Sequence, residues 1–140
     1  MLIRLDTDVP NVDRDRFDYR LHWLVANIKI SPTQTQAVGD WTRSPDTLAD
    51  WLPPHVQKGS PYHRYSLVVF KQPRGAMDVS GLADKIKRHR FNLRSFKAKH
   101  TLEPIGAFMW RAQWDEHTKD LMQRHGLPGW DAMLVRKKAV

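Results

Sequence analysis

Two segments of the chain are largely apolar on both of their alternating faces. In residues 21–28, Leu21 and Trp23 occupy one face while Leu24 and Ala26 occupy the other, and residues 65–70 follow the same pattern. A strand with one face in water would show polar residues at every second position. The pattern is therefore typical of strands in the middle of a sheet that is covered on both sides.

Further strands are predicted on either side of these two. Residues 108–114 alternate apolar and polar side chains, which predicts a half-buried strand whose buried face carries Phe108, Trp110, Ala112 and Trp114. Residues 1–5 predict a fourth strand with poorly defined ends. The prolines cluster in connecting segments, so residues 31–63 are predicted to form a long ordered loop with Trp41 and Trp51 inside it.

One helix has clear ends. Asp115 is a good N-cap and Gly126 a good terminator, so a helix is predicted over residues 115–125, with Leu121 and Met122 facing inward. Residues 81–89 and 92–99 predict short helices. Because strands outnumber helices and do not alternate with them regularly, the expected fold class is α+β and β-rich.

The length of 140 residues and an apolar fraction of 41% suit one domain with its own core. We therefore expect residues 1–140 to form a single domain, with residues 131–140 as a basic C-terminal tail. The chain has no cysteine, which excludes disulfides, thiolate metal sites and cysteine nucleophiles. No apolar run approaches the length of a membrane span.

The net charge of +8 lies entirely in the second half of the chain. Residues 1–70 contain eight Lys or Arg and eight Asp, whereas residues 71–140 contain fifteen basic and seven acidic residues. The excess gathers in a basic segment without acids, residues 85–100, and at the C-terminus. One interpretation is a solvated face without a partner. The other is phosphate binding through counterion release, which carries no sequence specificity.

Under the second interpretation, the candidate RNA-binding residues are Lys85, Lys87, Arg88, Arg90, Arg94, Lys97, Lys99, Arg136, Lys137 and Lys138.

Four polar residues are candidates for a small ligand site. His22 lies in an apolar strand, His63 precedes another, and Asp6 and Asp8 follow the first predicted strand, before a turn at Pro10. Two carboxylates and two imidazoles at strand ends suit a pocket for a small anion. The alternative is a satisfied core histidine and aspartates that cap a turn. Sequence motifs of serine hydrolases, phosphate-binding loops and zinc proteases are missing, so no catalytic residue, cofactor or metal is expected.

Several segments, in this order, resemble the phosphatidylethanolamine-binding protein family. They are Asp6-Thr7-Asp8-Val9-Pro10, residues 21–28 with their histidine, residues 58–65 ending in His63-Arg64-Tyr65, and residues 91–96, 104–107 and 113–115. The resemblance implies a β-rich α+β domain with an anion pocket formed by Asp6, Asp8, Pro10, His22, His63 and Tyr65. Thr7 and Pro61 depart from the family's proline and glycine, and because proline fixes φ, the loop that approaches a ligand is altered.

One branch of the family is similar in more detail, namely the mitochondrial large-subunit ribosomal proteins that contain this domain. This similarity rests on residues 22–28, 51–60, 70–72 and 104–115. It implies a structural place in the central protuberance of the mitochondrial large ribosomal subunit, with rRNA and other ribosomal proteins as partners. A free-standing family member that binds a phosphorylated small ligand, or inhibits a protease or kinase, is the alternative.

The beginning of the sequence leaves no room for a targeting peptide, because strand-like residues follow Met1 directly. Members of the ribosomal branch carry a targeting region and further sequence before the domain. We therefore expect either a chain that needs no such segment or one whose first strands are not in this sequence.

Overall fold

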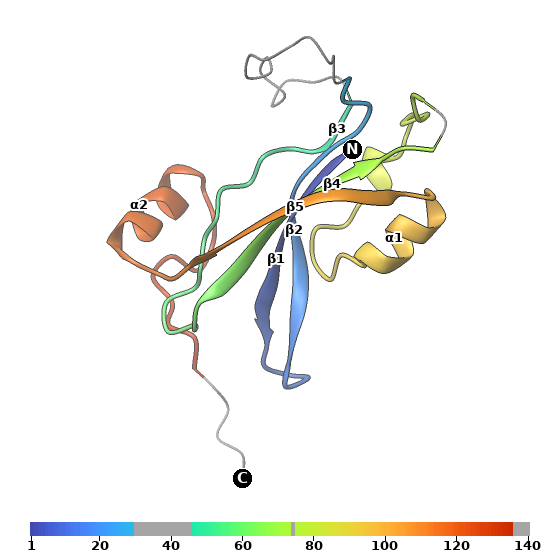
Figure 1. The fold of residues 1–140 in the computed structure, drawn as a ribbon. Coiled ribbons are helices and arrows are strands. Elements are labelled where there is room, and N and C mark those ends of the chain that lie inside the picture. Colours follow the sequence, from blue (N-terminus) through green and yellow to red (C-terminus); the bar gives the residue numbers. More distant parts are fainter. Residues whose placement is uncertain (30–45, 74, 136–140) are drawn as a thin grey trace.

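The computed structural model describes residues 1–29, 46–73 and 75–135, which contain one antiparallel five-stranded sheet in the order β3-β2-β1-β4-β5 (Figure 1). The strands are β1 (Leu2–Asn11), β2 (Arg16–Val25), β3 (Thr47–Ala49), β4 (His63–Lys71) and β5 (Glu103–Ala112). The helices α1 (Leu93–Lys99) and α2 (Glu116–Arg124) lie on opposite sides of the sheet in Figure 1. The predicted β-rich α+β class is confirmed.

The centre of the sheet is β1, between the two strands that were predicted to be central. The prediction that the first strand ends before Asp6 is wrong, because β1 continues to Asn11. A register shift between Asp6 and Val9 lets the strand pass through this segment. Beyond Asp6, β1 pairs with β2 and no longer with β4, so Pro10 lies where the missing amide breaks no second ladder.

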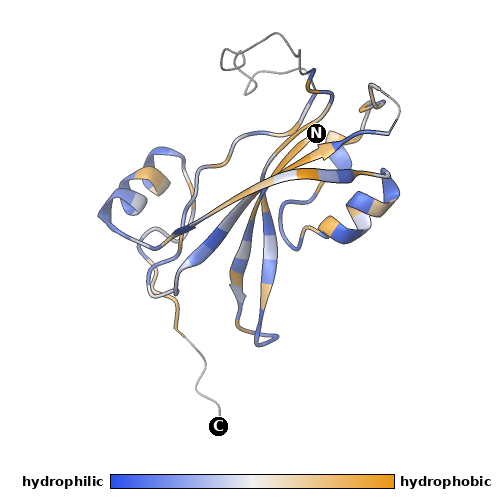
Figure 2. Ribbon diagram, in the orientation of Figure 1, coloured by the Kyte–Doolittle hydropathy of each residue, from blue (hydrophilic) through white to orange (hydrophobic). Residues whose placement is uncertain are grey.

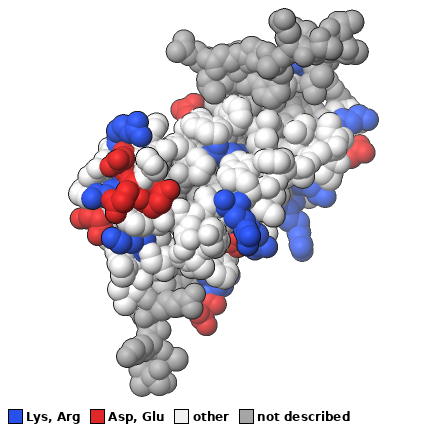
Figure 3. All heavy atoms as spheres, turned by 60° about the vertical axis from the view of Figure 1, so that its left-hand side comes forward, with Lys and Arg blue, Asp and Glu red and all other residues white. Residues whose placement is uncertain are grey.

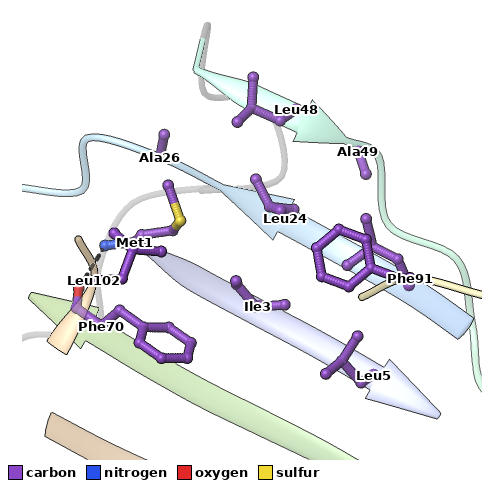
Figure 4. Close-up of a cluster of buried hydrophobic side chains, with 11 residues drawn as sticks. Met1, Ile3, Leu5, Leu24, Ala26, Leu48, Ala49, Phe70, Phe91 and Leu102 are labelled. Carbon is purple, nitrogen blue, oxygen red and sulfur yellow. Dashed lines mark hydrogen bonds between the residues drawn. The ribbon is translucent and has the colours of Figure 1, made fainter. Parts of the chain in front are cut away.

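The main core lies on the face of the sheet that α1 and residues 77–86 cover. Eleven buried side chains form it, and Figure 4 shows Ile3, Leu5 and Leu24 at its centre with Phe70 and Phe91 around them. Leu93 and Phe96 of α1 pack against this cluster. The tip of the β1–β2 hairpin is mainly hydrophilic (Figure 2) and accordingly exposed. The hydrophobic effect thus fixes one end of the hairpin and leaves the other in water.

The prediction of a half-buried strand at residues 108–114 is wrong in its burial. Trp110 is partly buried, but Phe108 is 65% exposed and Met109 is 53% exposed. The reason is position: β5 is an edge strand that pairs only with β4, and few of the described residues cover it. Alternation correctly predicted a strand, but it does not reveal whether anything covers the strand's apolar face.

Three other expectations concern local structure. Both predicted C-terminal helices are present, α1 behind the N-cap Asn92 and α2 behind Asp115, whose carboxylate accepts the Thr118 amide at 2.7 Å. The helix expected at 81–89 is wrong: only a 3-10 turn forms at Ala83–Lys85, because residues 88–91 instead bond their backbone to β2. The loop expected at 31–63 contains β3, and Trp41 lies outside the described residues.

Among the described residues, neither helix has the length and apolarity needed to span a membrane.

Candidate functional site

A buried chain of hydrogen bonds joins β1, β4 and the loop before β4. The Asp6 carboxylate accepts from His63 Nδ1 at 2.7 Å, and His63 Nε2 lies 2.6 Å from Ser60 Oγ. Asp6 also accepts the Asp8 amide at 2.9 Å. Because Nδ1–H donates to Asp6, Nε2 is left to accept from the serine hydroxyl, which is the order of groups in a Ser-His-Asp triad. We call these three residues the Asp6–His63–Ser60 chain.

Ser60 lacks two features of a nucleophile. It is only 5% exposed, so a substrate has little access to its hydroxyl. Its backbone amide donates to the Gln57 carbonyl at 3.0 Å, whereas the nucleophile's own amide often stabilises the oxyanion in acyl transfer. The geometry therefore supports a structural role, in which each polar group of the chain satisfies the next.

His22 lies next to this chain as a neutral imidazole. Its Nδ1 lies 2.9 Å from the Leu52 carbonyl oxygen and donates to it, and its ring meets Tyr65 edge-on at 5.2 Å. Burial lowers the pKa of His22 to about 3. His55 is arranged similarly, with Nδ1 toward the Pro53 carbonyl, and burial lowers its pKa as well. Both rings therefore remain uncharged at neutral pH.

Two arginines complete the cluster, and the sequence analysis missed both. Arg4 is 1% exposed, and its guanidinium lies 3.6 Å from the Trp51 ring centre and donates to the Leu52 carbonyl at 2.5 Å. Burial lowers the pKa of Arg4 to about 10, at which it is still charged near neutral pH. Arg20 donates to His55 Nε2 at 3.1 Å. The signal for Arg4 was its place two residues before Asp6 in a strand, which puts both side chains on one face.

Four of the six predicted pocket residues come together in this cluster, namely Asp6, His22, His63 and Tyr65. Asp8 instead faces Arg64, which contacts both carboxylate oxygens at 2.7 and 2.9 Å. Hydrogen bonds from Arg64 hold the pKa of Asp8 below its usual range. Pro10 lies farther along the hairpin and is partly exposed. His55 and Ser60 are the remaining members that the sequence analysis missed.

The polar atoms of the cluster suit an anion better than a metal ion. Within the described residues, Arg4 Nε and Nη1, Arg20 Nε and His22 Nε2 are buried without a hydrogen-bond partner. Three of these four atoms are donors of charged groups. No set of three or more histidine and acidic side chains in the described ranges is placed to hold a metal ion.

The basic segment, residues 85–100, is attached to the outer edge of β2. The Leu21 amide donates to the Arg88 carbonyl at 2.8 Å, and the Phe91 amide donates to the Tyr19 carbonyl at 3.0 Å. Five of the predicted RNA-binding cations lie exposed along this segment and α1 without an ion pair among the described residues: Lys85, Lys87, Arg94, Lys97 and Lys99. Arg90 is also exposed and lies 3.5 Å from Asp18.

Arg88 differs from its neighbours. It is partly buried, and its guanidinium donates to the Asp50 carbonyl at 2.8 Å and to the Leu21 and His22 carbonyls at 3.3 and 3.4 Å. Arg88 thus holds the basic segment in place rather than facing outward. The predicted cations Arg136, Lys137 and Lys138 lie outside the described residues.

A sequence model of the family described as phosphatidylethanolamine-binding protein matches residues 1–118. The chain belongs to this family. A structure of a phosphatidylethanolamine-binding protein from Plasmodium vivax has the same fold, with a TM-score of 0.57 and 21% identity over 81% of this chain and 63% of that one. Large ribosomal subunit protein mL38 of Schizosaccharomyces pombe is 32% identical over 124 residues, which are 89% of this chain and 38% of that protein.

In this phosphatidylethanolamine-binding protein domain, the two departures from the family signatures do not break the Asp6–His63–Ser60 chain. Thr7 directs its hydroxyl to the Arg64 carbonyl at 3.3 Å, away from His63. Pro61 is exposed and follows Ser60, whose hydroxyl still reaches the imidazole. The departures therefore alter the rim of the cluster and leave its interior intact.

Removing the central carboxylate should destabilise the domain. In Asp6→Ala, the buried donors His63 Nδ1–H and Asp8 N–H lose their acceptor, and each unsatisfied buried group costs about 1–3 kcal/mol. We expect the free energy of unfolding in urea to fall by about 2–4 kcal/mol. The exposed Asp84→Ala is the control and should change it by less than about 0.5 kcal/mol. Equal effects of the two substitutions would show that the buried chain contributes no stability.

Proposed function

We propose that this chain is a structural component of the mitochondrial large ribosomal subunit, in its central protuberance, where it contacts rRNA and neighbouring ribosomal proteins and acts without catalysis. The main support is the 32% identity to large ribosomal subunit protein mL38 over most of the chain. The proposal includes a mitochondrial location for the chain. It treats the ligand cluster of the family as a structural core.

The distribution of charge supports a polyanionic partner independently. Figure 3 shows acidic and basic side chains mixed on the side where α2 lies, and Lys119 there is 3.8 Å from Glu116. The basic segment has no acidic residue from Lys85 to His100. Cations compensated by neighbouring carboxylates release few counterions on binding, whereas uncompensated ones favour a phosphate backbone.

A free-standing protein that binds a phosphorylated ligand is the second candidate, favoured by the orphaned donors of Arg4 and Arg20. The burial of the cluster favours it less. His22 and Tyr65 are 0% exposed and Asp6 is 1% exposed, so a ligand would have to displace packed side chains to reach them. The one-sided positive charge also has no role in this candidate function.

Sedimentation distinguishes the two candidates. A tagged chain should co-sediment with mitochondrial large subunits and remain bound through a moderate salt wash. Recovery of the chain only at the top of the gradient would contradict the ribosomal role. A rise in melting temperature with phosphoethanolamine, abolished by His22→Ala, would support the second candidate instead.

A further inference from the structure

A pocket lies between the tip of the β1–β2 hairpin and the start of α1, away from the buried cluster. It has a volume of about 330 Å³, and its walls include Arg16, Phe17, Asp18, Tyr19, Arg90 and Arg94. Figure 1 shows the segment leading into α1 beside β2, where the Phe91 amide donates to the Tyr19 carbonyl. We call this the hairpin pocket. Its volume is at the small end of the range for ligand sites, about 300–1,000 Å³, which limits it to one small group.

Two aromatic side chains stand in water at this pocket. Phe17 is 54% exposed and Tyr19 is 44% exposed, and because they are two residues apart in β2 they lie on the same face of the sheet. This face is the one that carries the main core farther along β2, at Leu21. The core face therefore continues into solvent as an aromatic platform that no described residue covers fully.

Three arginines surround the two rings. Asp18 holds two of them, with Arg16 Nε at 3.1 Å and Arg90 Nε at 3.5 Å from its carboxylate oxygens. Arg94 projects from the first turn of α1 and makes no ion pair among the described residues. Three cations against one carboxylate leave the pocket with a net positive charge. Guanidinium groups both stack on planar rings and bind phosphate with paired hydrogen bonds.

We propose that the hairpin pocket binds one unpaired nucleotide of an RNA strand, with its base on Phe17 and Tyr19 and its phosphate on Arg90 and Arg94. Exposed aromatics beside basic groups are what single-stranded nucleic acid requires, because every base has a face for stacking. Arg90 and Arg94 also belong to the basic segment, so the pocket continues the proposed RNA surface. The inference rests on the proposed function and specifies how part of that surface recognises RNA.

The test compares single-stranded RNA with duplex RNA of the same sequence. Fluorescence anisotropy of a labelled ten-nucleotide strand, alone and annealed, gives both affinities at one salt concentration. Phe17→Ala/Tyr19→Ala should weaken binding of the single strand by about 5- to 150-fold, the value of one or more stacked bases. It should leave duplex binding within about twofold, because duplex bases are already stacked.

Two further variants separate stacking from folding and from general apolarity. Phe17→Trp keeps an aromatic face and should bind the single strand at least as tightly as the wild type. Phe108→Ala removes an equally exposed ring on β5 and should change neither affinity. Circular dichroism and thermal melting show whether each variant is folded.

The outcomes are distinct. Unchanged single-strand affinity in Phe17→Ala/Tyr19→Ala, with salt-sensitive RNA binding intact, would overturn the hairpin pocket and leave the ribosomal role standing. No binding of either RNA by the wild type would overturn both. A loss in that variant of binding to a polyglutamate peptide but not to RNA would identify a protein-binding surface and also overturn the proposal.

Discussion

Replacing Lys85, Lys87, Lys97 and Lys99 together with glutamine is expected to remove most of the salt dependence of RNA binding. If the wild-type surface contacts 6–10 phosphates, its affinity should fall by about 10³–10⁵ between 50 and 200 mM salt. Each lost phosphate contact lowers the slope of log K against log salt by about 0.9. Four lost contacts should make the decline of the variant over the same range about 100-fold smaller. Anisotropy titrations at four salt concentrations measure both slopes.

The two helices provide a matched control. Lys97→Gln/Lys99→Gln removes two uncompensated cations from α1, whereas Lys119→Gln/Arg124→Gln removes two from α2, where Glu116 and Asp120 lie nearby. Glutamine is a good helix former, so both helices should persist. The α1 pair should lower the slope by about 1.8, and the α2 pair should leave it nearly unchanged. Equal slopes for the two pairs would show that net charge alone, and not the basic segment, drives binding.

The parts of the fold that the sequence predicts are those fixed by side-chain pattern. β2 and β4 were recognised because buried strands must be apolar on both faces, and α2 because Asp115 and Gly126 mark its ends. What failed depends on neighbours distant in the sequence. The exposure of Phe108 follows from the edge position of β5, and the loss of the helix at 81–89 follows from hydrogen bonds between residues 88–91 and β2.

The buried cluster shows the same division. Asp6, His22, His63 and Tyr65 were found through a family resemblance, which carries over only positions that match a motif. Arg4 matches no signature, and its role depends on Trp51, 47 positions away, whose ring lies over the guanidinium. Ser60 became visible only when the loop placed its hydroxyl on the imidazole. Such contacts follow from the tertiary structure and from no local spacing.

The stability of the domain should decrease steeply as the pH falls below about 6.5, and His22 should be a main cause. Its pKa is about 3 in the folded protein and about 6.5 when unfolded, so between these values the unfolded chain binds a proton that the folded chain excludes. Stability from this residue is complete above the unfolded pKa and is lost on acidification, by about 1.4 kcal/mol per pH unit. Urea unfolding at pH 7, 6 and 5 should show a loss of about 2 kcal/mol.

His22→Asn isolates this contribution, because asparagine keeps an N–H for the Leu52 carbonyl and does not titrate. The variant should be less stable than the wild type at pH 7, and its stability should fall by about 2 kcal/mol less between pH 7 and 5. The pKa of His55 is also lowered by burial, so part of the pH dependence should remain. Asp8 acts in the same direction, but only near its own unfolded pKa of about 4, below this range. The exposed His117→Asn should keep the wild-type pH dependence; if His22→Asn keeps it too, His22 is not excluded from protonation by the fold.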